Sequence, residues 1–302
     1  MVGATHTVAA QARAPNTLRG IALVLGAVLL FACMDVTTKH LAARYPVPLV
    51  VAVRYLGNLL LLMGVMAPRH GWALVKTERT GLVILRALFL GLASLCAGLA
   101  LQRMPVAETT AIIFLSPIGV LLAAGPLLGE RAGPAGWVSA AVSFAGVLMI
   151  ARPGGGLDGV GVLFALATAA TTIGSVLLSR SLARTESTMA MLFWVALTGA
   201  ALFGAMLPWF WRGPAPGVLD SGLFLGIGAL ALAGHALFTA AFREAPASLL
   251  APFNYVHLAW AGLLGWLVFG HVPDAYALAG IALIAASGAA IALKTHWDRG
   301  RG

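Results

Sequence analysis

The sequence predicts an all-α polytopic membrane protein with ten transmembrane helices, arranged as two inverted five-helix repeats around a central cavity. Of the 302 residues, 60% are hydrophobic and 10% are charged, against roughly a quarter charged in an ordinary soluble domain. The apolar segments are long and continuous, and the two halves of the chain match at a constant offset. These features exclude a soluble enzyme, a disordered chain, a secreted disulfide scaffold and an outer-membrane barrel, whose strands would alternate with period two.

Five segments of the first half reach the length of about 20 mostly apolar residues that a membrane-spanning helix needs. Pro46 and Pro48, the charged stretch 68–79 and the Gly- and Pro-containing stretch 129–134 separate them. We expect residues 1–18 to form a mobile cytoplasmic tail rather than a signal peptide. The predicted helices are 19–43, 48–67, 80–101, 105–128 and 134–151, and together they form a first repeat over 19–151.

The stretch RPGGGLD at 152–158 predicts a linker at the midpoint of the chain. Polar connections at 212–220 and 270–274 divide the apolar segments that follow. Residues 295–302 are then a short cytoplasmic C-terminal tail. The predicted helices are 159–183, 188–208, 218–241, 246–269 and 274–294, and together they form a second repeat over 159–294.

The basic residues predict the orientation in the membrane. The chain has 19 Lys and Arg against 10 Asp and Glu, a net charge of +9. With the N-terminus inside, twelve basic residues lie on the cytoplasmic side and five outside, as the positive-inside rule favours. We therefore expect a multi-pass protein of the bacterial inner membrane with both termini cytoplasmic. Its expected partners are the lipid bilayer and a small-molecule substrate, without nucleic acid, and we expect it to function as a monomer.

An internal repeat is visible when the sequence is shifted by 141 positions, which we name the repeat offset. Because five helices per half is an odd number, the second copy must enter the membrane in the opposite orientation. Inverted repeats are the architecture of alternating-access transporters, whose substrate site lies near the midplane between the halves. The matched pairs include Gly20 with Gly161, Thr38 with Ser179, Pro105 with Pro246, and Gly129 with Gly270.

Two segments resemble a known family: MPVAETTAIIFLSPIGVLLAAGPLLGERAGPAGWVSAAVSFAGVLMI and APASLLAPFNYVHLAWAGLLGWLVFGHVPDAYALAGIALIAASG. The chain resembles the drug/metabolite transporter superfamily in its ten-helix form with two EamA-type repeats, particularly bacterial amino-acid and metabolite exporters of the YddG type. The resemblance covers 19–294 and implies outward transport of small organic molecules without ATP. The family usually has Glu at the end of the fourth helix of each repeat. Glu130 matches in the first repeat, but His271 stands there in the second.

Charged residues inside predicted helices are functional candidates because burying a charge in a membrane is costly. Asp35 is the only acid well inside the first helix, and Lys39 lies four residues on, where the two can pair. The alternatives for Asp35 are an ammonium-binding or proton-coupling acid, or a pair with Arg54. For Arg54 and Arg86, snorkelling toward an interface is favoured over binding of a carboxylate.

Two further acids and two prolines are candidates for coupling, gating or bending. Glu108 lies in the first turn of a helix, where it can cap the helix or take part in coupling. Glu130 is interpreted as structural, and the resemblance adds a gating contact. Pro117 and Pro252 interrupt the helices at 105–128 and 246–269, either as hinges between conformations or as static bends.

Polar and aromatic residues on four helices are the candidate substrate contacts. Thr168, Thr172, Ser175 and Ser179 share one helix face, where they either line a cavity or pack helix against helix. Each buried His either binds substrate or a proton, or makes an interhelical hydrogen bond. No closely spaced set of metal ligands occurs, so neither metal nor cofactor is expected. The candidate contacts are Met34, Phe114, Thr172, Ser175, His235, Asn254, Tyr255, His257 and Trp260.

The sequence therefore favours a secondary transporter that exports small amphipathic metabolites, amino acids first among them, by alternating access. A passive facilitator or channel is the nearest alternative. A membrane-embedded enzyme acting on lipids is the more distant one, and no HExxH or GxSxG motif supports it.

Overall fold

A computed structural model describes residues 17–128, 134–151, 156–182, 185–211, 215–245 and 250–299, and every regular element within these ranges is a helix. The first half contains α1 (Thr17–Ala42), α2 (Val47–His70), η1 (Gly71–Leu74), α3 (Thr80–Arg103), α4 (Val106–Ile113), α5 (Ser116–Leu128) and α6 (Pro134–Ala151). The second half contains α7 (Gly159–Leu182), α8 (Thr188–Phe210), α9 (Val218–Glu244), η2 (Ala251–Tyr255), α11 (Val256–Phe269) and α12 (Ala275–Arg299).

Six of these helices are long and apolar enough to cross a membrane: α1, α2, α3, α7, α8 and α9. Four shorter apolar stretches lie at 106–120, 137–151, 253–269 and 275–290. The described part of the chain is therefore an all-helical, multi-pass membrane protein.

Two of the predicted helices are broken near their prolines. Phe114 and Leu115 separate α4 from α5, and Pro117 is the second residue of α5. Backbone N–H groups in the first turn of a helix make no hydrogen bond within it, so proline is tolerated at this position. Pro252 lies in the short 3-10 helix η2, directly before α11. The predicted interruptions are thus present, and each gives two helical pieces in place of one.

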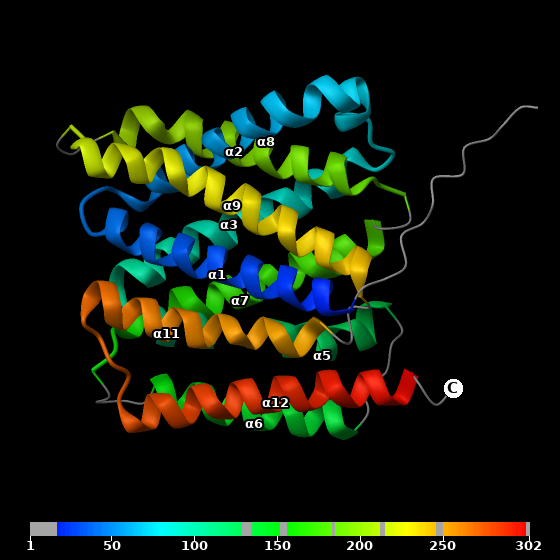
Figure 1. Cartoon of the computed structure of the whole chain (residues 1–302), viewed down its shortest axis with the longest axis vertical. Helices are drawn as coiled ribbons and strands as arrows, with labels where there is room; N and C mark the ends of the chain where they lie inside the picture. The colour runs from blue at the N-terminus through cyan, green and yellow to red at the C-terminus, as the bar shows by residue number, and fades with distance from the viewer. Residues whose placement is uncertain are drawn as a thin grey trace, which may run out of the picture.

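The helices lie side by side with their axes roughly parallel (Figure 1). α6 packs on α12 at one edge of the bundle and α2 packs on α8 at the opposite edge. Between these edges, α1 packs on α9 and α11, and α3 packs on α7. α1 begins and α12 ends at the same end of the bundle, which we name the terminal end, and we name the opposite one the distal end (Figure 1).

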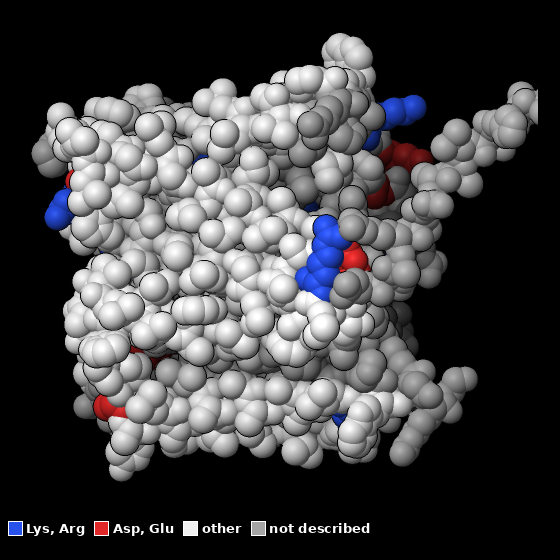
Figure 2. All heavy atoms as spheres, in the orientation of Figure 1, with Lys and Arg blue, Asp and Glu red and all other residues white. Residues whose placement is uncertain are grey.

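The sides of the bundle are apolar. In Figure 2 the charged residues gather toward the two ends, and the face between them is almost free of charge. Trp137, Leu163 and Leu225 are 63%, 67% and 79% exposed on such surfaces. Large apolar side chains can be exposed to this extent where lipid is the solvent.

Close contacts recur at the repeat offset. A Cβ added to Gly20 would lie 2.9 Å from the Ala245 side chain, and one added to Gly161 would lie 2.6 Å from the Met104 side chain. At this offset, Gly161 is the counterpart of Gly20, and Ala245 is the counterpart of Met104. The α1–α9 and α7–α3 helix pairs are therefore packed through matching positions of the two halves.

The α6–α12 pair shows the same relation within one interface. Ser139 and Ser287 hydrogen-bond through their hydroxyls at 2.7 Å, and Gly146 closely approaches Gly280. At the repeat offset, Gly280 is the counterpart of Ser139, and Ser287 is the counterpart of Gly146. The two contacts therefore exchange when the halves are exchanged, as expected for a two-fold relation between α6 and α12.

At each end of the bundle, a buried acid accepts hydrogen bonds from a helix connection of the other half of the chain. At the distal end, Asp220 of α9 accepts hydrogen bonds from the Tyr45 hydroxyl at 3.0 Å and from Arg44 at 3.1 Å. At the terminal end, Glu186 accepts from the backbone N–H of Arg79 at 2.7 Å. Burial, reinforced by the bond to Asp220, raises the pKa of Tyr45. Tyr45 therefore stays protonated and can donate its hydrogen bond.

Candidate functional site

An acid and a histidine meet in the middle of the bundle. Asp35 Oδ2 of α1 lies 3.1 Å from His257 Nε2 of α11, and the side chains are 20% and 12% exposed. α1 brings them together because it packs against both η2 and α11. The separation is an ion-pair distance, but the groups are not aligned as a hydrogen bond, and Nε2 has no other hydrogen-bond partner among the described residues.

The predicted pairing of Asp35 with Lys39 is wrong. The Lys39 ammonium instead donates to the carbonyl oxygens of Leu101 and Met104, at 2.8 and 2.6 Å, and lies over the Phe269 ring. Lys39 therefore satisfies carbonyls that the end of α3 leaves open. Asp35 is left to His257, which comes from the other half of the chain.

Aromatic rings surround the acid–histidine pair. The His257 ring is 5.7 Å from Phe114 and 6.5 Å from Phe31, measured between centroids. Phe114 also lies 5.2 Å from Tyr255, and Phe31 lies 5.0 Å from His235. We name these six residues the central cluster: Phe31, Asp35, Phe114, His235, Tyr255 and His257.

The two broken helices both contribute to the central cluster. Phe114 lies in the break between α4 and α5, and Tyr255 is the last residue of η2. The Tyr255 hydroxyl packs against Gly288 of α12, where any larger side chain would overlap it. Discontinuous helices of this kind form the substrate and ion sites of many secondary transporters.

Arg54 and Arg86 contact neighbouring helices, against the expectation that they snorkel. Arg54 lies over the Tyr55 ring at 5.1 Å and 3.9 Å from the Met34 sulfur, next to Asp35 in sequence. Arg86 donates to the Ser179 hydroxyl at 2.5 Å. Within the described residues, neither guanidinium lies at ion-pair distance from a carboxylate.

The hydroxyl-bearing face of α7 is largely used for packing. Thr168 bonds to the Phe164 carbonyl and reaches the Ala93 carbonyl of α3 at 3.5 Å, and Ser175 is 2% exposed. Thr172, by contrast, is half-buried. The geometry therefore favours helix packing for Thr168 and Ser175 and leaves Thr172 as the accessible member of the face.

Asn254 and Trp260 each bury a polar atom. Asn254 Oδ1 and Trp260 Nε1 have no hydrogen-bond partner among the described residues. Such atoms are costly to bury unsatisfied, and a polar ligand or water can supply the missing bond. Their place on the η2–α11 segment keeps both as candidate contacts.

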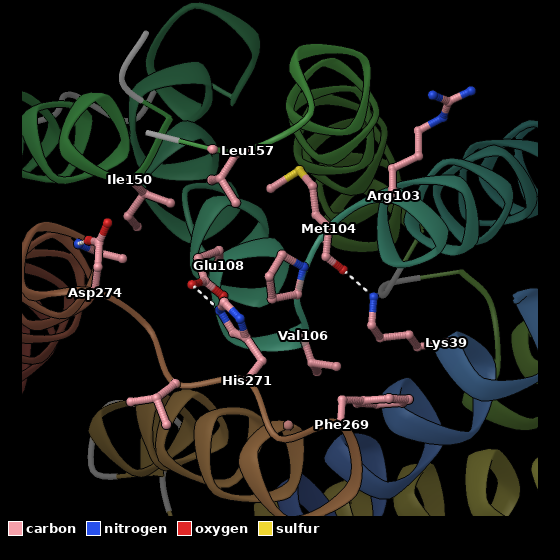
Figure 3. Close-up of a pocket in the computed structure, with 15 residues that line it drawn as sticks. Lys39, Arg103, Met104, Val106, Glu108, Ile150, Leu157, Phe269, His271 and Asp274 are labelled. Carbon is pink, nitrogen blue, oxygen red and sulfur yellow. Dashed lines mark hydrogen bonds and ion pairs between the residues drawn. The ribbon is translucent and has the colours of Figure 1, made fainter. Parts of the chain in front are cut away.

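A pocket of about 540 Å³ opens at the distal end of the bundle (Figure 3). Glu108 of α4 and His271, after α11, meet in it, with Oε1 and Nε2 2.8 Å apart. The Glu108 side chain is 3% exposed and the His271 side chain 40%. We name this the distal pocket, and its polar lining residues are Lys39, Arg103, Glu108, His271 and Asp274.

Three expectations from the sequence concern Glu108, Glu130 and metal binding. Glu108 does lie in the first turn of α4, but its carboxylate meets His271 rather than a helix-capping group. Glu130 lies outside the described residues. Among the residues that the structure describes, no group of three or more His, Cys, Asp or Glu could hold a metal ion.

Comparison with known proteins identifies the family. The model of the EamA-like transporter family matches residues 18–152 and again 159–293. The chain belongs to the EamA-like transporter family. The two matches begin at positions 18 and 159, which are related by the same repeat offset as the recurring contacts.

Relatives of the chain carry transporter names with different substrates. A riboflavin transporter of Rhizobium johnstonii is 29% identical over 84% of this chain and 84% of its own. The pseudopaline exporter CntI of Pseudomonas aeruginosa is 27% identical over 88% and 93%. An S-adenosylmethionine uptake transporter of Rickettsia felis is 26% identical over 88% and 90%. Export and uptake both occur among these names, so family membership leaves direction and substrate open.

A solved crystal structure shares the fold. It superposes with a TM-score of 0.66 at 21% sequence identity and covers 91% of this chain and 96% of the other. The helical arrangement is therefore that of a known protein structure.

Proposed function

We propose that this chain is a secondary transporter that moves small amphipathic metabolites, with amino acids first among them, out of the cytoplasm by alternating access. The observation that carries the proposal is the Asp35–His257 pair at 3.1 Å. A carboxylate and an imidazole in contact inside a membrane protein can hold a proton or bind a charged substrate group. Each comes from a different half of the chain, so a rearrangement of the halves changes their contact.

The charges around the central cluster fit a zwitterionic head group. Asp35 offers a carboxylate to an ammonium group. Arg54, which reaches Met34 beside Asp35, offers a guanidinium to a carboxylate, a geometry for which Arg is well suited. The rings of Phe31 and Phe114 supply an apolar surface for a side chain. An amino acid carries all three of these features.

The proposed architecture is ten spans in two inverted repeats. The recurrence of contacts at the repeat offset supports it, most directly through the exchange of Ser139–Ser287 with Gly146–Gly280. An odd number of spans per repeat inverts the second copy. With the N-terminus inside, the terminal end is cytoplasmic and the distal end faces the periplasm, in a bacterial inner membrane.

The experiment is uptake of a panel of radiolabelled amino acids into liposomes that contain the purified protein, with and without a pH gradient. His257→Ala is the test variant, and Trp266→Ala is the control, because Trp266 lies on the same helix and is 52% exposed. The proposal predicts saturable uptake that a gradient makes concentrative, lost in His257→Ala and kept in Trp266→Ala. Equal uptake with and without the gradient would instead indicate a facilitator.

A further inference from the structure

We propose that the distal pocket is a second binding site, which takes the ammonium group of an amphipathic metabolite on the carboxylate of Glu108. The inference rests on the proposed function, because it assigns a second binding site to the same class of substrate. The central cluster and the distal pocket share no residue, so each site can be tested separately.

The Glu108 carboxylate has an unused acceptor atom. Oε1 meets His271, whereas Oε2 is buried and has no hydrogen-bond partner in the described part of the chain. Glu108 as a whole is 2% exposed, and Figure 3 shows its carboxylate turned toward the pocket. A buried carboxylate oxygen without a donor is unfavourable, and an ammonium group, with three N–H donors, can relieve this cost.

The other charged groups around the pocket have partners of their own. Lys39 donates to two carbonyls at the end of α3. Arg103 pairs with Asp158 at 3.4 Å, and Asp274 accepts from the Ala277 N–H at the start of α12. Glu108 is therefore the acid whose contacts leave a buried oxygen for a ligand.

The shape and lining of the pocket fit an amphipathic ligand. Its volume of about 540 Å³ lies within the range of small-molecule sites in proteins. Its apolar walls come from four different parts of the fold: Val106, Ile150, Leu157 and Phe269. A ligand with an ammonium head and an apolar body can place the head at Glu108 and cover these walls.

His271 lies where it can compete with a ligand, since its Nε2 is 2.8 Å from Glu108 Oε1. Protonated His271 is a cation that competes with the ligand for Glu108, whereas neutral His271 does not. The other charged side chains that line the pocket are Lys39 from α1, Arg103 from α3 and Asp274 from the connection before α12.

The test is protection of a cysteine placed in the pocket. Val272 lines the pocket and is 61% exposed, so Val272→Cys can react with a maleimide in a full-length background that carries Cys33→Ala and Cys96→Ala. The probes are 2-phenylethylamine, phenylalanine and 3-phenylpropionate, which differ in their charged groups and share an aromatic body. Labelling rates are measured with and without each probe at one fixed pH.

The proposal predicts that the two compounds with an ammonium group slow labelling and that 3-phenylpropionate does not. Glu108→Gln should raise the concentration for half-protection by about tenfold, the effect of one charge-assisted hydrogen bond. Glu244→Gln is the matched control, since it makes the same change at an acid that pairs with Arg19 at the terminal end, outside the pocket.

Equal protection by all three probes, or protection that survives Glu108→Gln, would overturn the second site. If Glu108→Gln does not fold, the comparison of the three probes on the unchanged Glu108 decides alone. His257→Ala can lose uptake as the proposed function predicts while no probe protects the cysteine at position 272. That result would refute the distal site and leave the proposed function intact.

Discussion

The molecule contains two acid–histidine pairs, and they differ in what surrounds them. Asp35 and His257 are both largely buried and lie among aromatic rings, 3.1 Å apart. Glu108 is buried, but its partner His271 is 40% exposed at the distal end of the bundle. The first pair is screened from bulk solvent, whereas the second has one member in contact with it. The comparison teaches that the same two residue types occur in different surroundings: a water-poor, aromatic one at the central pair and a half-open one at the distal pair, which is why we propose different roles for them.

The largest effect should come from Asp35→Asn, which removes the charge of the central pair. We expect the initial rate of gradient-driven uptake to fall at least about tenfold, because the proposed hydrogen bond from the substrate ammonium group to the Asp35 carboxylate would contribute about 1.5–3 kcal/mol. The measurement is radiolabelled uptake into liposomes. Asp158→Asn, which removes an exposed acid at the distal end, should leave the rate within about twofold, as surface pairs contribute little. Comparable losses of uptake rate in both variants would show that the central pair contributes no more to transport than an exposed acid at the distal end.

Phe114→Ala should act on affinity more than on rate. An aromatic pair contributes about 0.5–1.5 kcal/mol beyond its buried area, so the half-saturating concentration of an aromatic amino acid should rise by about two- to tenfold. Phe144→Ala, at a ring on α6 that is 54% exposed, is the control. An unchanged half-saturating concentration in Phe114→Ala would place the substrate away from the central cluster.

Glu108→Gln should reduce transport by a smaller factor than Asp35→Asn. Gln keeps an acceptor for His271 and loses only the charge, so we expect uptake to remain concentrative and to slow by less than about tenfold. Uptake at matched protein density, with and without a gradient, checks this. A complete loss of accumulation would make the distal pair, rather than the central one, the coupling site.

His271→Gln should have the smallest effect of these substitutions. The Gln amide can still donate a hydrogen bond to Glu108 Oε1 and leaves the charge of the carboxylate in place, so we expect the half-protecting concentration of 2-phenylethylamine to change by less than about fivefold. The cysteine-protection assay measures this directly. A loss of protection as large as that in Glu108→Gln would show that the site also needs the imidazole.

The repeat can be predicted from the sequence alone, but the contacts between its charged residues cannot. The repeat offset, read from matches such as Gly20 with Gly161, recurs in the packing of those glycines. Helix breaks at Pro117 and Pro252 were predictable because proline lacks the N–H that a helix interior needs. These features depend on local chemistry and periodicity, which a sequence displays.

The pairing of charges depended on contacts between distant segments. Asp35 and Lys39 share a helix face at four-residue spacing, yet α11 brings His257 to Asp35 and the end of α3 binds Lys39. His271 drew attention only as a departure from the Glu found in the family, and its contact with Glu108 spans 163 positions. Phe31 shares an apolar helix face with Met34 in the sequence, which favours a cavity wall, but its contacts with His235 and His257 depend on how α9 and α11 pack.

The most direct test of the central pair is substrate-driven proton movement. Liposomes that contain the protein and a trapped pH-sensitive dye are given an amino acid found to be transported, without an imposed gradient. The account predicts a change in lumenal pH with the unmodified protein and none with Asp35→Asn, while Glu108→Gln retains the change. A full pH change in Asp35→Asn would contradict the assignment of coupling to the Asp35–His257 pair.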